Sequence, residues 1–346
     1  MNASLSSPVD PILTFDIGGT HFRCAVVQAN QIIEVRKLPS PSFYQFRNLS
    51  GEELVDRLVQ LICGMIEDFE KRHPHLSGVA LAVPGLVTHH GVVVSAPPLW
   101  GDLISKVPLQ SVIQARTRLK VTVFNDLCGT ALFYSQLPSF SEGVDFVTVI
   151  TLSTGVGSKT VDVKQKRVLL DAGGMAGEIG HVIVDFSENA TPCDCGGKGH
   201  LSSYLSGRGL AQFIRSKKRH DPDLFDDCGI SLTSDDVVVL QSFAEAVHNH
   251  DARAWDILNF SAARLAFLIH VISGTFAVDR YVLVGNVAHS LGEDLRTAVN
   301  QHLADIGVWG WDKSRVAGLI HLGIPDDNIG LLGAAKYGAT RLGLQS

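Results

Sequence analysis

Short apolar runs and one long helical pattern make up the first part of the chain. The runs Ile12–Phe15, Cys24–Val27 and Ile32–Val35 are separated by glycine or polar residues, which predicts a hairpin or meander that opens a sheet. Apolar residues then recur at helical spacing over Gly51–Lys71, which predicts an amphipathic helix.

The same theme returns in the second half of the chain. Buried strands are predicted at Val121–Phe124 and Phe146–Leu152, and the latter leads into the glycine-containing turn 153–158. A comparable turn at 16–20 also follows an apolar strand. This weak internal symmetry indicates a duplicated α/β architecture whose two halves face each other across a cleft.

Other segments are predicted from composition and from helical spacing. Two prolines and a glycine leave Ala96–Gly101 without regular structure, and the charged segment Ser216–Asp227 is expected to be a surface loop. Glycines with scattered Cys and His make 172–207 a ligand-bearing loop region. Helices are expected at Asp251–Ser273 and at Leu331–Leu342.

Length and charge narrow the class of protein. A chain of 346 residues exceeds the usual size of one core and favours two domains. The formal charge of −6 gives no electrostatic footprint for nucleic acid or an anionic membrane. No apolar run is expected to span a bilayer, and the polar N-terminal residues contain no signal core. A cytoplasmic protein is expected, in which Cys24, Cys63 and Cys128 are buried free thiols.

The turn after the first strand has the chemistry of a phosphate site. It reads Asp16-Ile17-Gly18-Gly19-Thr20. Two glycines allow close approach to the backbone, a hydroxyl can contact a phosphate oxygen, and a carboxylate can hold Mg²⁺ or its waters. Taken alone, a plain Asp/Gly hairpin turn explains this run equally well. A second turn with Thr154, Gly155 and Gly157 makes a phosphate clamp the better interpretation.

These turns, together with the strand-end pair Asn125-Asp126, resemble the sugar kinases of the ROK family (repressors, open reading frames, kinases). The resemblance runs from Leu13 to the final helix. It implies a two-domain α/β fold of the actin-like (hexokinase-like) ATPase type with a cleft between the domains. It also implies transfer of the γ-phosphate of MgATP to a hydroxyl of a hexose or N-acetylhexosamine, and a homodimer.

The domains expected from this resemblance divide the chain near its middle strand. Residues 1–124 form a small N-terminal α/β domain to which the closing helix 331–346 returns. Residues 125–330 form a large C-terminal α/β domain. It carries a loop with Cys193 and Cys195 that is expected to bind zinc. The repressor branch has a DNA-binding helix-turn-helix ahead of this region. Since the first strand is predicted to begin at Ile12, we expect no such domain and no nucleic-acid partner.

Asp126 is the leading candidate for the catalytic base. A sugar hydroxyl is a poor nucleophile, so phosphoryl transfer benefits from a carboxylate that accepts its proton. Position alone favours a simple helix cap for Asn125-Asp126. The resemblance assigns the base to Asp126, sugar binding to Asn125 and Gly85, and the adenosine-side strand end to Gly285.

A second cluster combines sugar ligands with metal ligands. Glu178 and His181 resemble the Glu-x-Gly-His motif with which the family holds sugar hydroxyls. His181, Cys193, Cys195 and His200 form His-x11-Cys-x-Cys-x4-His, a donor set that suits structural tetrahedral Zn²⁺. The alternatives are a disulfide, which the cytosol and the one-residue spacing disfavour, or a chance Cys pair.

Several residues depart from the family pattern. His200 stands where the family has a third Cys, Ser202 replaces a sugar-binding Glu, and Pro98 replaces an Asn. Ser158-Lys159 stand where glycine is common, and Val284-Gly285-Asn286 has one glycine where three are common. These departures leave open a second interpretation, a degenerate ROK-type sugar-binding regulator without kinase activity. A third, an ATPase or phosphohydrolase without a sugar substrate, is disfavoured by the Glu178/His181 pair.

Overall fold

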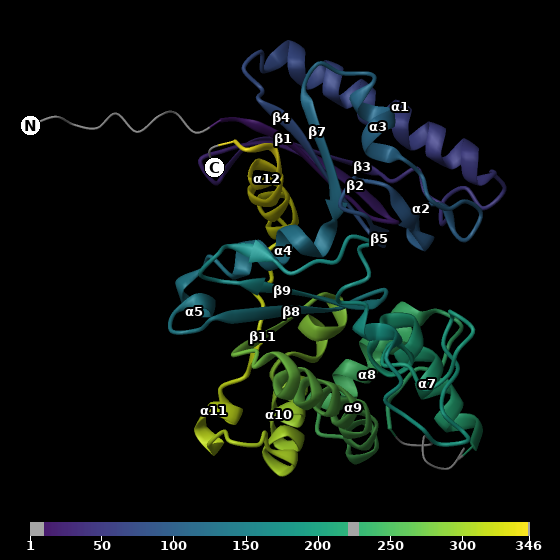
Figure 1. Ribbon diagram of the computed structural model, residues 1–346. Coiled ribbons are helices and arrows are strands. Elements are labelled where there is room, and N and C mark those ends of the chain that lie inside the picture. Colours follow the sequence, from purple (N-terminus) through teal and green to yellow (C-terminus); the bar gives the residue numbers. More distant parts are fainter. Residues whose placement is uncertain (1–9, 221–227, 345–346) are drawn as a thin grey trace, which may run out of the picture. The chain divides into compact units, whose positions relative to one another are not determined.

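The computed structural model describes residues 10–220 and 228–344 (Figure 1). The described chain forms two compact units. One comprises the chain up to Phe133, Val168–Ala176, and the chain from Asp326 onward. The other comprises Tyr134–Arg167 and Gly177–Pro325.

A five-stranded sheet with the order β3-β2-β1-β4-β7 forms the centre of the first unit. Its strands are β1 (Ile12–Ile17), β2 (His21–Gln28), β3 (Gln31–Pro39), β4 (Gly78–Val83) and β7 (Lys120–Asn125). The first three strands form the predicted antiparallel meander, whereas β4 is parallel to both β1 and β7. The short hairpin β5 (Leu86–Val87) and β6 (Val93–Ser95) follows β4.

Helices cover both faces of this sheet (Figure 1). They are α1 (Gly51–Arg72), α2 (Pro97–Trp100), α3 (Leu109–Gln114), α4 (Asp126–Tyr134) and α12 (Ile329–Leu342). Alternate strand residues such as Leu13 and Phe15 share a buried cluster with α1, while Ile12 and Ala80 lie against Gly338 of α12. The two-residue period of a strand therefore supplies both apolar faces.

The predicted helix over 51–71 is confirmed as α1, and its start is explained by a capping box. The Ser50 hydroxyl accepts a hydrogen bond from the Glu53 amide at 3.2 Å, and the Glu53 carboxylate accepts one from the Ser50 amide at 2.8 Å. These bonds satisfy backbone donors that the first turn of a helix leaves open.

The second unit repeats the arrangement of the first. Its sheet has the order β10-β9-β8-β11-β12, with β9 antiparallel to β8 and with β8, β11 and β12 parallel. The strands are β8 (Phe146–Leu152), β9 (Val156–Asp162), β10 (Arg167–Val168), β11 (Arg280–Val284) and β12 (Ile320–Leu322). In both sheets a hairpin turn joins the central strand to its antiparallel neighbour, so the turns 18–20 and 153–155 occupy equivalent positions.

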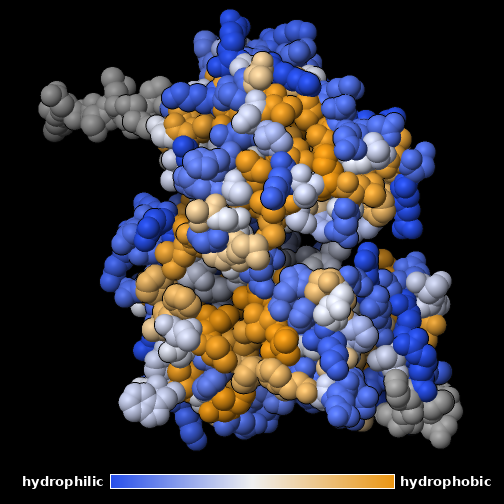
Figure 2. All heavy atoms as spheres, turned by 45° about the vertical axis from the view of Figure 1, so that its right-hand side comes forward, coloured by the Kyte–Doolittle hydropathy of each residue, from blue (hydrophilic) through white to orange (hydrophobic). Residues whose placement is uncertain are grey.

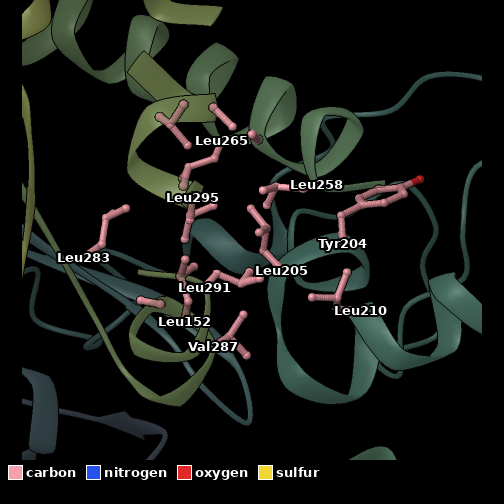
Figure 3. Close-up of a cluster of buried hydrophobic side chains, with 14 of the residues drawn as sticks. Leu152, Tyr204, Leu205, Leu210, Leu258, Leu265, Leu283, Val287, Leu291 and Leu295 are labelled. Carbon is pink, nitrogen blue, oxygen red and sulfur yellow. The ribbon is translucent and has the colours of Figure 1, made fainter. Parts of the chain in front are cut away.

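Helices and a buried aliphatic cluster complete the second unit. The helices are α5 (Pro138–Ser141), the 3₁₀ turn η1 (Ile179–His181), α6 (Ser202–Leu205), α7 (Gly207–His220), α8 (Asp236–His248), α9 (Ala252–Phe276), α10 (Asn286–Ile306) and α11 (Lys313–Ala317). Figure 3 shows the cluster, in which Leu152 at the end of β8 lies among side chains of α10 such as Val287 and Leu291. The core thus reaches the strand end that carries the second glycine turn.

The structure corrects three local expectations. Residues 97–100 form the short helix α2, because proline is favoured in the first turn of a helix, where its missing N–H is not needed. Helix α7 extends to His220, so the beginning of the expected loop 216–227 is helical. Residues 221–227 lie outside the described part of the chain. Helices α10 and α11 and strand β12 were not predicted.

One helix of the described residues is long and apolar enough to cross a membrane by length and composition. It is α9, with a mean hydropathy of 1.5 over an 18-residue window. This corrects the expectation that no apolar run reaches that length. Half of the window is buried, and residues such as Leu258 and Leu265 belong to the core of the second unit. That pattern is typical of a core helix.

The surface itself is mixed. On the face that Figure 2 shows, hydrophobic residues are visible between hydrophilic ones. Among the large hydrophobic side chains of the described chain, Trp309 is 97% exposed and Phe186 is 80% exposed. Because folded proteins generally expose much apolar area, this distribution alone does not define a partner.

Candidate active site and metal centre

The first glycine turn lies at the end of β1 and is covered by the segment after β3. The Gly18 amide donates to the His21 carbonyl at 2.8 Å, which closes the turn. The Ser42 hydroxyl donates to the Gly19 carbonyl, and the Ser40 amide donates to the Thr20 carbonyl at 3.3 Å. These donors occupy the turn's carbonyl oxygens. Thr20 remains exposed at the tip.

Gly19 is required by packing. A Cβ atom at this position would lie 2.7 Å from the Tyr44 ring and 3.0 Å from Cβ of Pro98. Any larger residue would displace one of them. Tyr44 and Pro98 therefore form an apolar border beside the turn.

Asp16 is ion-paired within its own hairpin. Arg23 stands opposite Asp16 in the β1–β2 register and donates to its carboxylate. The same guanidinium donates to the Asp327 carbonyl, just before α12. The Asp16 side chain is 15% exposed. Arg23 therefore orients this carboxylate and ties it to the returning C-terminal segment.

Asn125 and Asp126 lie at the junction of β7 and α4, as the sequence predicts for the end of a parallel strand. The Asn125 amide group donates to the Gly85 carbonyl at 2.9 Å and to Oδ1 of Asp126 at 3.1 Å. The same Asp126 oxygen accepts from the Leu127 amide at 2.8 Å. These bonds hold Asn125, Asp126 and Gly85 together at one edge of the sheet.

Gly85 adopts a conformation that favours glycine. Its φ is +90°, and a Cβ atom there would lie 2.1 Å from the Ser95 carbonyl oxygen. The loop after β4 is thus pressed against the end of β6, two residues before the proline pair 97–98. Within the first unit, Asp126 is therefore connected to Gly85 through Asn125, and Gly85 packs against Ser95. Pro98 follows shortly after Ser95 and borders Gly19.

The second glycine turn has a more open environment. Thr154 and Gly155 are exposed, and nothing lies within 4 Å of a Cβ atom placed on Gly155. The Gly207 amide at the start of α7 donates to the Ser153 carbonyl at 2.7 Å. Gly285, with φ of +95°, is packed against the Leu152 carbonyl and precedes α10. Two helix N-termini therefore adjoin the turn, an arrangement that suits an anion.

Glu178 lies next to a buried lysine. Burial raises the pKa of the Glu178 carboxyl, and the ammonium of Lys159 acts in the opposite direction. Lys159, on β9, is only 3% exposed. The Glu178 carbonyl accepts from the His181 amide at 3.2 Å, so Glu178 and His181 flank a single 3₁₀ turn.

The four predicted metal ligands converge. One donor atom from each of His181, Cys193, Cys195 and His200 lies within 4.8 Å of the others. A tetrahedral Zn²⁺ with ligand distances of about 2.0–2.3 Å would hold such donors about 3.3–3.8 Å apart. The observed donor set needs only a small contraction to fit it.

Close packing within the loop supports this convergence. Sγ of Cys195 lies 3.2 Å from Nδ1 of His200, and the His181 and His200 rings meet edge to face at 5.6 Å. A Cβ atom on Gly197 would lie 2.5 Å from the His200 ring, so a glycine is needed for the chain to turn here. Burial, together with the neighbouring His181, lowers the pKa of His200 and favours the neutral imidazole that a metal requires.

Contacts of Asp185 anchor the loop 181–200 to helices α6 and α9 of the same unit. The Tyr204 hydroxyl of α6 donates to the Asp185 carboxylate at 2.7 Å, and Arg264 of α9 lies 3.5 Å from the same carboxylate. Burial tends to raise the pKa of Asp185, but the bonds from Tyr204 and the Ser187 amide, with the Arg264 charge, lower it to about 2.

The predicted residues thus form two groups, each within one unit. In the first unit the structure brings together Asn125, Asp126 and Gly85, and places Asp16, Gly18, Gly19 and Thr20 on one turn. In the second it gathers the four metal ligands beside Glu178, and places Thr154, Gly155 and Gly285 at neighbouring strand ends.

Sequence reasoning missed Arg23, Tyr44 and the role of Lys159. Arg23 could have been found, because the short turn after Asp16 sets the hairpin register. The lysine at position 159, where the family resemblance leads one to expect glycine, was a signal whose meaning depended on the fold. Tyr44 had no signal, since the segment after β3 shows no periodicity.

A model of the ROK family matches residues 12–336. The C(7)-cyclitol 7-kinase of Streptomyces hygroscopicus subsp. jinggangensis is 31% identical over 350 residues, which cover 99% of this chain and 97% of that protein. The 2-epi-5-epi-valiolone 7-kinase of an Actinoplanes species is 28% identical over 310 residues, which cover 87% of this chain and 84% of that protein.

Solved structures agree with the fold. The ROK hexokinase from Thermus thermophilus has a TM-score of 0.75 at 21% identity, over 96% of this chain and 99% of that one. A ROK family transcriptional regulator, described as a homologue of the E. coli MLC protein, has a TM-score of 0.75 at 19% identity, over 97% of this chain and 79% of that one. At such identities the likeness concerns the fold alone, and the predicted actin-like, hexokinase-like α/β fold is confirmed.

Proposed function

This chain belongs to the ROK family, whose model matches most of its length, and on that premise we propose that it is an ATP-dependent kinase for a polyhydroxylated ring. The single observation that carries the proposal is the Asn125-Asp126 pair, held beside Gly85 at the end of a parallel strand. A regulator that only bound a sugar would not need a base at this position.

We assign proton acceptance to Asp126. The backbone amide of Leu127 and the Asn125 side chain both donate to one oxygen of the Asp126 carboxylate. Such bonds fix the orientation of the carboxylate. An ionised carboxylate in a fixed position can take the proton of the acceptor hydroxyl as that hydroxyl attacks the γ-phosphorus.

Each unit offers groups that suit part of MgATP. The turn Gly18-Gly19-Thr20 offers a hydroxyl and an approachable backbone, and Asp16 offers a carboxylate oriented by Arg23. Thr154, Gly155 and the helix N-termini near Gly285 suit an anionic phosphate chain. Mg²⁺, when bound with ATP, would neutralise charge on the transferring phosphoryl group.

A structural Zn²⁺ would be held by His181, Cys193, Cys195 and His200. Its chemical contribution is a closed coordination shell that fixes the loop. His181 would have two roles, because it is one of the four candidate metal ligands and also one end of the turn that presents Glu178. We propose that this shared histidine couples the order of the loop to the position of Glu178, which holds acceptor hydroxyls.

The preferred acceptor is proposed to be a C7 cyclitol, with a hexose or N-acetylhexosamine as the second class. The cyclitol kinase relative matches 99% of the chain at 31% identity. Ser202 and Pro98 depart from the pattern that the family resemblance implies for sugar recognition. The Ser202 hydroxyl packs toward Gly180, and Pro98 borders Gly19. We further propose that the protein is cytoplasmic, since ATP and reduced thiols are available in that compartment. The family resemblance leads us to propose a homodimer as well.

A coupled ADP-release screen tests the proposal. The acceptors are 2-epi-5-epi-valiolone, glucose and N-acetylmannosamine, each assayed with and without the protein. Acceptor-dependent ADP release is expected, fastest with the cyclitol. Acceptor binding by calorimetry without any turnover would instead favour the sugar-binding regulator, which the fold shared with a transcriptional regulator keeps in view.

A further inference from the structure

A lysine is buried inside the second unit, where charge is costly. Lys159 lies in the middle of β9, pairs with Val149 of β8, and is 3% exposed. An ammonium group removed from water needs an opposite charge or several acceptors nearby. A methionine of similar length would fill the same space without that cost, so the charge itself needs an explanation.

The lysine side chain points to the segment that carries Glu178. A Cβ atom on Gly177 would lie 3.3 Å from the ammonium nitrogen of Lys159. Glu178 is the next residue, and its carboxylate interacts with the Lys159 charge. The ammonium therefore lies against the backbone that presents this carboxylate.

The same segment is held to β9 by the residue before Lys159. The Ser158 amide donates to the Gly177 carbonyl at 2.7 Å. Gly177 has φ of +97°, and a Cβ atom there would lie 1.8 Å from the Ser158 carbonyl oxygen. Backbone contact and charge thus act on adjacent residues, and together they set both the position and the direction of Glu178.

We propose that Lys159 is a positioning residue, which holds the Glu178 carboxylate in the orientation that binds acceptor hydroxyls. The inference rests on the kinase function proposed above and deepens it. A carboxylate that accepts hydrogen bonds from hydroxyl groups must keep its oxygens at hydrogen-bond distance from the ring, and a buried charge close to it orients the carboxylate without competition from solvent. Because the pair has no net charge, it suits a neutral polyol.

The test compares Lys159→Met with two matched variants. Lys159→Arg keeps the charge. Thr160→Val alters the next residue of β9, whose hydroxyl contacts Thr148 at 2.8 Å within the sheet. We expect Lys159→Met to raise the acceptor KM about tenfold or more, as for loss of a charged contact. The KM for MgATP and the bound zinc should not change. Lys159→Arg should restore part of the loss, and Thr160→Val should leave the acceptor KM near that of the unmodified protein.

A double-mutant cycle separates positioning from general destabilisation. If Lys159 acts through Glu178, then Lys159→Met should change the acceptor KM by less than about threefold in a Glu178→Gln background. The double variant contains no unpaired buried charge, so it also serves where Lys159→Met alone does not fold. An unchanged acceptor KM in Lys159→Met, or a full additional effect in the Glu178→Gln background, would overturn the inference.

The cycle also distinguishes this idea from the proposed function. If the unmodified protein shows acceptor-dependent turnover and Lys159→Met leaves the acceptor KM unchanged, only the role of Lys159 is refuted. If the unmodified protein binds an acceptor but never turns it over, the kinase function fails, and the dissociation constants of the same variants then test Lys159 by calorimetry. If neither 2-epi-5-epi-valiolone, glucose nor N-acetylmannosamine binds, both proposals fail.

Discussion

Single residues at strand ends carry most of the proposed chemistry. Asp126 follows β7, and the turn of Gly18-Gly19-Thr20 follows β1. Both strands are buried, and each is parallel to β4, which lies between them. Their carboxyl ends therefore lie at the same edge of one sheet. The strands supply a rigid base, and the exposed strand ends supply the functional groups.

Asp126→Asn is expected to abolish most turnover. The amide preserves the size of the side chain and its bonds to neighbours but cannot accept the hydroxyl proton, so kcat should fall about 10²–10⁴-fold while the acceptor KM changes little. Steady-state ADP release checks this. The control is Asp102→Asn, the same change at an exposed position in the same unit. Turnover within tenfold of the unmodified protein would remove Asp126 from the role of base.

Two helices of the first unit meet through glycine. A Cβ atom on Gly333 of α12 would lie 2.5 Å from the backbone of Gly129 in α4. This contact explains why α4 groups with the first unit, whose chain continues to Phe133. The division expected between residues 124 and 125 stays a prediction about the domains.

Gly333→Ala should destabilise the protein. The added methyl group meets backbone and cannot be accommodated by a side-chain movement, so the free energy of unfolding should fall by about 1–3 kcal/mol. Urea unfolding measures the change. Gly64→Ala in α1 is the matched control, because nothing lies within 4 Å of its Cβ position. That variant should gain about 0.5–1 kcal/mol from helix propensity. Equal effects of both substitutions would contradict the close-packing explanation.

The loop 181–200 contains little regular structure, so its conformation depends on contacts between its own side chains, such as those of Cys195 and His200. We expect purified protein reconstituted with zinc to bind one ion per chain, measured by mass spectrometry of the metal. Chelation should lower the melting temperature, since the ligand set is closed and structural. His200→Ala should lose the metal, whereas His200→Cys should retain it. A protein that stays metal-free after reconstitution, with an unchanged melting temperature, would refute the site.

At the scale of the whole molecule, two sheets with the same strand order are each stabilised by their own apolar cluster. Buried polar networks add pH dependence to this stability. The clearest is Asp185, which links the metal loop to α6 and α9.

Asp185 should make the protein sensitive to acid. Its pKa is lowered to about 2 in the folded state, below the unfolded value of about 3.9. A lowered pKa stabilises the fold above the unfolded value, and this contribution is lost as the pH falls from about 4 toward 2. The free energy of unfolding of Asp185→Asn should therefore be about 2 kcal/mol lower at pH 7. It should also decline less steeply than that of the unmodified protein between about pH 4 and pH 2.

Urea unfolding at several pH values measures this effect. Asp145→Asn, which removes an exposed ion pair with Lys164, is the control and should change stability by less than about 0.5 kcal/mol. If Asp185→Asn keeps the stability and pH profile of the unmodified protein, the Tyr204 and Arg264 contacts do not stabilise the fold through this carboxylate.

Periodicity was sufficient for the regular elements that are strongly patterned. Helix α1, the opening meander and strands β7 and β8 were predicted because burial imposes a two-residue or helical period. Helix α10 was not predicted, although its buried residues, such as Leu291, Leu295 and Val299, recur at helical spacing on both sides of Gly292. Helix α2 was missed because prolines signal both loops and helix starts.

The sequence alone determined which chemical groups this protein contains. They are the Asp/Gly turns, the Asn125-Asp126 pair, and a set of two thiols and two imidazoles. Residue types and short spacings are local properties, and they survive without a fold. Only the tertiary structure decided what these groups contact. It brought four candidate metal donors within 4.8 Å of one another, tied Arg23 to the Asp327 carbonyl ahead of α12, and buried Lys159 beside Glu178. Such contacts depend on register and on packing between elements distant in sequence, which no local pattern encodes.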